Sequence, residues 1–396
     1  MKRILFTAAS LLSFLFVQAQ TTDSDTIKSR KLSLTEINFV SSYYNQEGNN
    51  AAVTGGIGSQ LLTDYSNTIE VNFIKHDKKQ RKVTYAGSLG VDHYTSASSD
   101  QVDLKANSSA SYADTRIYPS LGWTRENEKK RTTIGGEISS STEFDYQSYG
   151  GKISFSKKSK NQNSEIGGSL QAYLDEVQII RPIELRTFAN TVGGYTFSPR
   201  NTYTAGLSYS KIINKRLQIL IQGEVSSQHG YLSLPFHRVF LNSGVVRQEN
   251  LPDGRLRIPL AISGNYFYGD KLIIKAYVRV YKDDWGINSQ TASLELPVKI
   301  TPFFTISPHY RFYKQTAARY FRPFGEHSQV QNYYTSNYDL SEFASHFFGA
   351  GLRYAPVNGV LGMQNFGSLE LRYGYYTRSV GLNANLVTLL IQYKKN

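Results

Sequence analysis

The sequence contains no cysteine, only two methionines and two tryptophans, and seven histidines that stand singly among 396 residues. The absence of cysteine excludes disulfides, thiol catalysis, thiolate metal sites and covalent c-type haem. No two histidines have the spacing of metal ligands, and neither a Gly-x-Ser-x-Gly nor a His-Glu-x-x-His motif is present. The sequence signatures of the common hydrolases are therefore missing.

Long apolar runs are also missing after the first 20 residues. Lys2 and Arg3 open the chain, an apolar run covers 4–17, and Ala19 ends a small-residue cleavage site. This pattern predicts a secretory signal peptide over 1–19, and the lack of a following cysteine argues against a lipid anchor. No later segment approaches the ~20 apolar residues of a membrane-spanning helix. We therefore expect an exported chain.

The sequence is rich instead in segments that alternate apolar and polar residues, with 29 tyrosines, 21 phenylalanines and 31 glycines. In one of them, Leu272, Ile274 and Val278 share one face of a strand, while Lys275 and Arg279 share the other. Most segments are near the ~9–11 residues that a tilted strand needs to cross a bilayer. About sixteen strands are predicted, at 36–44, 67–76, 82–95, 115–126, 131–140, 148–156, 165–178, 201–212, 216–227, 255–268, 271–283, 289–301, 304–314, 345–356, 366–378 and 382–393.

The connections between these strands follow a regular order of lengths. When the connections are counted in chain order from the first predicted strand, the even-numbered ones are mostly short. The odd-numbered ones are often long, as at 45–66, 96–114, 179–200, 228–254 and 315–344. Outer-membrane barrels have short periplasmic turns and longer outer loops, so this order favours such a barrel with both ends in the periplasm. Three odd connections, near Ser141, Asp284 and Ser379, are short, which leaves a range of about 12–18 strands.

These patterns predict an all-β fold, a transmembrane antiparallel β-barrel of the outer-membrane type in a Gram-negative cell. The expected organisation is a signal peptide over 1–19, a flexible periplasmic lead-in over 20–35 and the barrel over 36–396. A soluble β-sandwich also alternates, but the signal peptide and the order of loop lengths favour the barrel. The net charge of +13 does not indicate a nucleic-acid partner, because the basic residues gather in turns and not on one face.

Charged residues within the predicted strands occupy the face opposite the apolar one. Two interpretations remain open: interior ion pairs that brace the wall, which the modest excess of cations favours, or a pore that prefers anions. A barrel of ~16 strands encloses an aqueous channel unless loops plug it, and 228–254 and 315–344 are long enough to do so. The predicted lumen charges are Lys275, Arg279, Glu295, Lys299, Arg311, Arg353, Glu370 and Arg372.

Side chains suited to catalysis or metal binding are present, but no spacing joins them into a site. The candidates are Asp92, His93, Asp100, Asp103, His229, His237, Asp283, Asp284 and His309. Asp92 and His93 are neighbours and point to opposite faces of a strand, which argues against a dyad. Asp100, Asp103 and Asp114 carry oxygens that suit Ca²⁺, as do Asp283 and Asp284, but further ligands are not identifiable. We predict no catalytic residue, no metal and no cofactor.

Six segments, at 50–58, 95–98, 109–116, 230–233, 281–287 and 311–318, carry the more distinctive residues of the chain. They include Gly55, Gly56, Gly58, Asp114, Arg116, Asp283, Asp284, Trp285 and Gly286. In this order the segments resemble the family known as domain of unknown function 3570, over nearly the whole mature chain. The resemblance implies an exported outer-membrane barrel without an assigned reaction, and a link to exported redox-type proteins. The residues alone indicate turns, with Trp285 at the membrane interface.

The sequence thus predicts a non-enzymatic envelope component, either a channel or a barrel that houses a periplasmic or surface protein. Its expected partners are outer-membrane lipid, such a protein, and small solutes or anions. Any redox centre would belong to the partner, because the chain has no Cys-x-x-Cys-His. The alternative function is a rim-active outer-membrane hydrolase.

Overall fold

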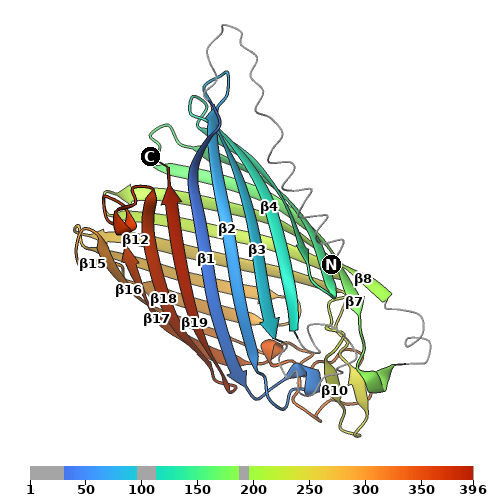
Figure 1. Ribbon diagram of the computed structural model, residues 1–396. Helices are drawn as coiled ribbons and strands as arrows, with labels where there is room; N and C mark the ends of the chain where they lie inside the picture. The colour runs from blue at the N-terminus through green and yellow to red at the C-terminus, as the bar shows by residue number, and fades with distance from the viewer. Residues whose placement is uncertain (1–30, 96–112, 187–195, 396) are drawn as a thin grey trace.

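The computed structural model describes residues 31–95, 113–186 and 196–395 (Figure 1). The predicted signal peptide, most of the predicted lead-in, and Asp100 and Asp103 lie outside the described residues. Across the described part of the chain, no helix has the length and apolarity needed to cross a membrane. The helices there are single 3₁₀ turns: η1 (Ala52–Thr54), η3 (Ile183–Leu185), η4 (Tyr338–Leu340) and η5 (Val360–Gly362).

Sixteen antiparallel strands form one closed sheet, which β1 completes by pairing with both β2 and β19. β14 and β15 act as one strand, because both pair with β13 and β16 and only Leu296 and Pro297 separate them. Pro297 lacks an N–H, which explains the local break in the ladder. The first half of the barrel comprises β1 (Ser33–Gly48), β2 (Leu62–His76), β3 (Lys82–Thr95), β4 (Ala113–Asn127), β5 (Thr132–Thr142), β6 (Tyr146–Lys158), β7 (Ser164–Ile179) and β8 (Thr196–Asn214). The second half comprises β9 (Leu217–Gly230), β12 (Gly254–Tyr268), β13 (Leu272–Asp283), β14 (Asn288–Glu295), β15 (Val298–Lys299), β16 (Phe304–Gln315), β17 (Phe343–Tyr354), β18 (Phe366–Arg378) and β19 (Leu382–Lys394).

The predicted barrel of sixteen strands is confirmed, and each predicted segment overlaps one observed strand. The strands extend further than the alternation indicates. β1 begins at Ser33, so the last residues of the predicted lead-in belong to the wall, and β8 begins at Thr196 and not at 201. The wall continues beyond the hydrocarbon layer, where an apolar face is no longer required, so the alternation fades before the strand ends.

A small second sheet was not predicted. β10 (Arg238–Phe240) and β11 (Val246–Gln248) form a hairpin inside the long connection between β9 and β12. Three residues on each side are too few for alternation to be recognised in the sequence. The hairpin gives this connection an ordered structure of its own.

Contacts that skip strands identify the inner face of the wall. Arg372 on β18 reaches Glu295 on β14, although β16 and β17 lie between them. Lys158 on β6 likewise reaches Glu126 on β4. Side chains this far apart along a curved sheet approach each other only on its concave side. Because residues alternate strictly between the two faces, the register of each strand pair then places every strand residue on the inner or the outer face.

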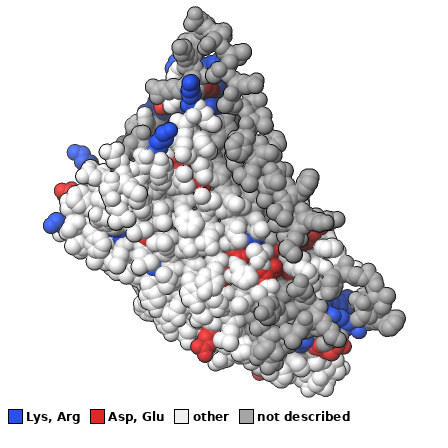
Figure 2. Space-filling model, in the orientation of Figure 1, with Lys and Arg blue, Asp and Glu red and all other residues white. Residues whose placement is uncertain are grey.

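The outer face is apolar and exposed. Leu121, Ile138, Leu207, Leu294 and Leu371 are each between 39% and 71% exposed on it. Figure 2 shows a broad band of uncharged atoms across the wall, with charged side chains gathered mostly toward the strand ends. A continuous apolar belt around a closed barrel is the surface expected against lipid hydrocarbon.

The longest connections lie at one end of the barrel, the lower end in Figure 1, together with the short connections 143–145, 284–287 and 379–381, whereas most connections at the other end are short. Both ends of the wall, at the start of β1 and the end of β19, lie with the short turns, since Glu36 pairs with Lys394. The turn after β2 is typical: the Asp77 carboxylate accepts the N–H groups of Lys79 at 2.8 Å and Arg81 at 3.0 Å. The connection 355–365, which contains η5, is a longer exception at this end.

Candidate functional site

The inner face is polar and charged over its whole height. All eight predicted lumen charges lie on it by register: Lys275, Arg279, Glu295, Lys299, Arg311, Arg353, Glu370 and Arg372. Arg353 and Lys299 are exposed near the short-turn end, while the other six lie closer to the middle of the wall. The lumen is therefore the first candidate for a functional site.

Four of these charges form one network along the wall. Glu295 Oε1 lies 3.2 Å from Lys275 Nζ and 3.4 Å from Arg372 Nη2. Arg372 Nε in turn donates to Glu370 Oε1 at 2.5 Å. A side chain at Gly351 would obstruct this path, because its Cβ would lie 3.2 Å from Arg372 Cγ. The network joins three regions of the wall, β13, β14 and β18, and stabilises their curvature.

Two arginines near mid-height carry no ion pair among the described residues. Arg311 is exposed and its guanidinium lies 5.1 Å from the centre of the Phe347 ring. Arg279, two strands away, has a buried Nε without a hydrogen-bond partner in the described part of the chain. These side chains present positive charge to the lumen that no protein carboxylate neutralises. In the network beside them, by contrast, each charged side chain is paired with one of opposite sign.

The long loops meet over one mouth of the barrel and form a cap, which we define as residues 49–61, 180–186, 231–253 and 316–342. The loop 49–61 follows β1 and the loop 231–253 follows β9, eight strands away in a ring of sixteen. Nevertheless Arg238 Nη1 donates to the Val53 carbonyl at 2.7 Å, and the side chains of Val53 and Phe236 share a buried cluster. The chain thus crosses the mouth from opposite sides, which narrows the opening at this end.

A buried carboxylate organises the centre of the cap. Glu249 accepts hydrogen bonds from the Thr335 hydroxyl at 2.5 Å and the Leu234 N–H at 2.7 Å, and His237 Nδ1 lies 3.4 Å away. Burial raises the pKa of Glu249, but the charge and hydrogen bond of His237 and the two other donors outweigh it. The pKa of this carboxyl therefore lies below its usual value, and the group stays ionised at neutral pH.

The cap should lose stability in acid. Because the pKa of Glu249 is lower in the folded cap than in the unfolded chain, its contribution is complete above about pH 4.3 and is lost as the pH falls through the folded value. The protection of 231–253 against hydrogen exchange, taken relative to the intrinsic exchange rate at each pH, should therefore fall in acid before that of the barrel strands does. In the Glu249→Gln variant, the amides of 231–253 should be weakly protected from exchange already at pH 7, and their protection should change little further in acid. Equal acid sensitivity in both proteins would contradict this.

The predicted glycine residues lie in the cap and are required for its close packing. Gly55 has φ +83°, and a Cβ there would lie 2.5 Å from Cδ2 of Phe240, which comes from the opposite side of the mouth. Gly56 has φ +88°, and a Cβ there would lie 2.6 Å from the carbonyl oxygen of Ser336. Gly58, with φ +85°, completes the turn. Only glycine adopts these conformations freely and admits the neighbouring loops so closely.

The segment 283–286 also packs against the cap. Asp283 accepts from Arg255 at 2.5 Å, and the Arg255 guanidinium lies 4.4 Å from the centre of the Trp285 ring. Trp285 is 3% exposed and donates to the Gly254 carbonyl at 2.9 Å. The expected interfacial position of Trp285 is therefore wrong, because the indole packs beneath Arg255 and Tyr320 and not against lipid. Asp284 is exposed, and Gly286 has φ +95° in the turn.

The predicted acidic and basic residues at the start of β4 are satisfied by neighbours. The Asp114 carboxylate accepts the Phe144 N–H at 3.0 Å, and Arg116 Nε donates to Ser141 Oγ at 2.9 Å. Asp114, Glu143 and Asp145 bring carboxylate oxygens within 4.8 Å of one another, a cluster that the sequence did not indicate. Arg116 and Tyr94 also contact Glu143, so the charge of the cluster already has protein partners.

The other catalytic candidates are not brought together. Asp92 faces the lumen and accepts from Ser66 and Tyr118, while His93 faces outward beside Thr115. His309 is on the inner face next to Phe347. One pair was missed: Ser227 Oγ lies 2.7 Å from Nε2 of His229 on the outer face of β9. The spacing of two residues on one strand is the only signal in the sequence that could have indicated it.

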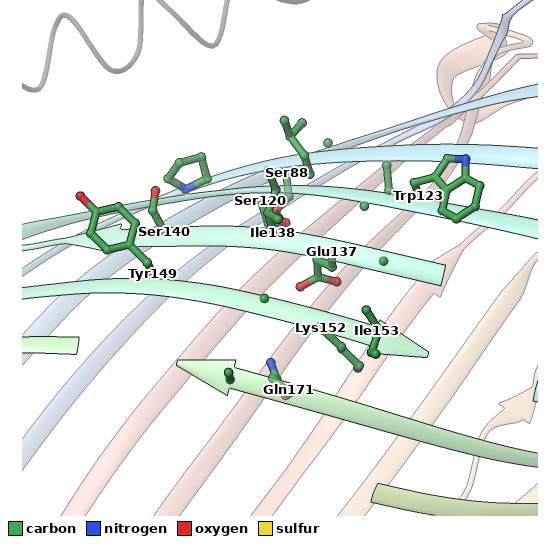
Figure 3. Close-up of a pocket in the computed structure, with 18 of the residues that line it drawn as sticks. Ser88, Ser120, Trp123, Glu137, Ile138, Ser140, Tyr149, Lys152, Ile153 and Gln171 are labelled. Carbon is green, nitrogen blue, oxygen red and sulfur yellow. Dashed lines mark hydrogen bonds between the residues drawn. The ribbon is translucent and has the colours of Figure 1, made fainter. Parts of the chain in front are cut away.

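A hollow along β2–β9 is part of the lipid-facing wall. Figure 3 shows Ile138, Tyr149 and Ile153 among its lining residues, together with Glu137 and Lys152 of the same strands. Its exposed surface is mainly apolar, and most of its side chains belong to the outer belt. It therefore has the character of a lipid contact and not of a polar binding site.

A family model described as "Protein of unknown function (DUF3570)" matches residues 5–389. The chain belongs to this family. The match covers nearly the whole sequence and confirms the resemblance noted from its motifs. No curated protein matches the chain.

Several solved outer-membrane proteins are similar in structure. One is a bacterial polysaccharide outer membrane secretin, with 10% identity, a TM-score of 0.46, and coverage of 92% of this chain and 99% of the other. Another is OccK1 (OpdK) of Pseudomonas aeruginosa, with 7% identity, a TM-score of 0.43, and coverage of 91% and 97%. A mutant of the monoaromatic hydrocarbon channel TodX has 9% identity, a TM-score of 0.42, and coverage of 92% and 90%.

Proposed function

We propose that this DUF3570 protein is an outer-membrane channel for small polar solutes, with a mouth narrowed by its cap. The observation that carries this proposal is the solvated interior of a closed wall. Gln222, Glu224 and Arg311 lie on the inner face and are nevertheless exposed. Interior side chains of a packed small barrel would be buried, whereas sixteen strands enclose water.

The arrangement of surfaces supports a place in the outer membrane. The apolar belt faces outward and ionised groups face inward, so lipid solvates the one and water the other. Short turns belong on the periplasmic side in such barrels, which puts the cap at the cell surface. A solute would then pass the cap before it reaches the charged middle of the lumen.

Reconstitution into planar bilayers tests the proposal. The mature protein should give unitary conductance, and proteoliposomes should swell in small neutral sugars but not in large oligosaccharides. Silent bilayers together with solute-impermeable liposomes would overturn the channel proposal and favour a barrel that houses a protein partner. Capture of a stoichiometric partner from native membranes would then identify that class.

The cap should set the upper size of the solute. Arg238 holds two loops, because it donates to the Val53 carbonyl and pairs with Glu184. Arg238→Ala should loosen the cap and raise single-channel conductance by about two-fold or less, since one of several contacts is lost. Arg216→Ala, at an exposed short turn, serves as the control and should leave conductance unchanged. Equal conductance of all three proteins would show that the cap does not limit passage.

The outward pair of Ser227 and His229 supports a second candidate function, a lipid-facing hydrolase. Ser227 Oγ would attack an ester carbonyl while His229 takes its proton, and the alcohol would leave as the ester C–O bond breaks, with that proton returned to it. Water would then hydrolyse the acyl-serine to a free fatty acid and restore Ser227. Asn201 lies opposite His229 in the register, but no described side chain hydrogen-bonds the second nitrogen of that imidazole. Fatty-acid release from phospholipid micelles that Ser227→Ala abolishes, and Ser88→Ala does not, would establish this function.

A further inference from the structure

The two halves of the lumen wall carry opposite charge. On the inner face of β1–β7, nine acidic residues stand against four basic ones. The acidic residues are Glu36, Asp64, Glu70, Asp92, Asp114, Glu126, Glu137, Glu165 and Asp175, and the basic ones are Lys82, Arg116, Lys152 and Lys158.

On the inner face of β8–β19 the balance is reversed, with eleven basic residues against four acidic ones. The basic residues are Arg200, Arg255, Arg257, Lys275, Arg279, Lys299, Arg311, Arg353, Arg372, Arg378 and Lys394, and the acidic ones are Glu224, Asp283, Glu295 and Glu370. The whole inner face is thus nearly neutral, and its charge is separated from side to side.

The separation is present near mid-height, where a solute must pass. Glu137 is the central residue of β5, and Arg311 lies near the middle of β16. These strands are eight positions apart in a ring of sixteen, so the two side chains stand on opposite sides of the lumen. Both are exposed, and neither forms an ion pair with another described residue, although Lys152 lies opposite Glu137 in the register and reduces the net charge there. Glu70, three strands from Glu137 on β2, and Arg279, two strands from Arg311 on β13, also face the lumen and extend the two poles along the wall.

A wall divided in this way produces an electric field across the lumen. Field lines concentrate between low-dielectric walls, so fixed charges act more strongly on a solute there than in bulk water. A simple anion is attracted by one side and repelled by the other, and gains little. A solute with a positive and a negative end gains on both sides when it lies across the lumen.

We infer that the lumen favours small zwitterions that carry a separate ammonium and carboxylate group, such as free amino acids. The ammonium group faces Glu70 and Glu137, and the carboxylate faces Arg279 and Arg311. This inference rests on the proposed channel function and specifies its class of solute. The near balance of the total charge explains why strong selectivity for either simple ion is not expected.

Flux measurements on the full mature protein in liposomes test the inference. Flux through the protein, taken as the excess over protein-free liposomes, should be several-fold faster for glycine than for acetamide and acetate, which resemble it in size but lack one or both charges. The variant Glu70→Gln with Glu137→Gln removes the acidic pole with little change of shape, and should abolish the preference for glycine and raise the relative flux of acetate. The control variant Glu126→Gln with Glu165→Gln, near the short-turn end of the wall, should retain the preference.

The outcomes distinguish a failure of the solute preference from a failure of the channel. Acetamide flux without a preference for glycine would overturn the transverse field and leave the channel in place. A glycine preference that survives in the Glu70→Gln, Glu137→Gln variant would also overturn it, because the preference would then have another origin. Absence of flux for every solute would remove the channel itself, and the inference with it.

Discussion

An arginine at Leu121 should destabilise the folded barrel by about 2–4 kcal/mol in lipid, whereas an arginine at the adjacent Ser120 should change stability by less than about 1 kcal/mol. Both residues lie near the middle of β4. Leu121 is 39% exposed on the outer face, while Ser120 is on the inner face and hydrogen-bonds Ser88. A cation at Leu121 must leave water for hydrocarbon, but at Ser120 it enters a solvated lumen lined by carboxylates.

Equilibrium unfolding of the two variants in phospholipid vesicles measures this difference. Ser120→Arg controls for the size and charge of the new side chain, because the two variants differ only in the face of the strand that carries the arginine. Equal costs at the two positions would show that the outer face is not against lipid. A larger cost at Ser120 would indicate that the interior is packed and not aqueous.

Reversal of two lumen charges should reverse ion selectivity. Arg279 and Arg311 carry no ion pair among the described residues, so Arg279→Glu with Arg311→Glu changes the charge near mid-height by four units without breaking the bracing network. Local concentrations of ions follow the potential of the fixed charges that line a pore. A weak preference for chloride in the parent should become a preference for potassium of several-fold or more.

Reversal potentials under a salt gradient in planar bilayers measure this selectivity. Lys314→Glu changes an outward-facing cation at the end of β16 that leads into the cap. It is the matched control and should have little effect on selectivity. Unchanged selectivity in the double variant would mean that ions do not pass these side chains. The two arginines would then serve only the structure of the wall.

Much of the fold could be predicted because a membrane barrel repeats one simple requirement. Every strand must alternate so that residues such as Leu294 face lipid and residues such as Glu295 face the lumen, and period-two alternation is visible in the sequence. The position of Ser33 in β1 was missed because strand ends beyond the hydrocarbon layer obey no such rule. The β10–β11 hairpin was missed because it is too short to show a pattern.

The candidate site was less predictable, because its contacts join distant parts of the chain. The burial of Trp285 beneath Arg255 depends on how a turn and the cap pack, and alternation says nothing of that. The same holds for Glu249, whose partner Thr335 is 86 residues away. The division of the lumen into acidic and basic halves becomes visible only when the closed register assigns each strand residue to a side.

By itself, the sequence determined that this chain forms a barrel of about sixteen strands and which strand residues share its polar face, since both follow from local alternation and loop length. Only the tertiary structure decided which charges pair and which remain free, how the loops close over one mouth, and which charges face each other across the lumen. Those properties depend on the order in which sixteen strands close into a ring, because closure brings together residues that no local pattern relates.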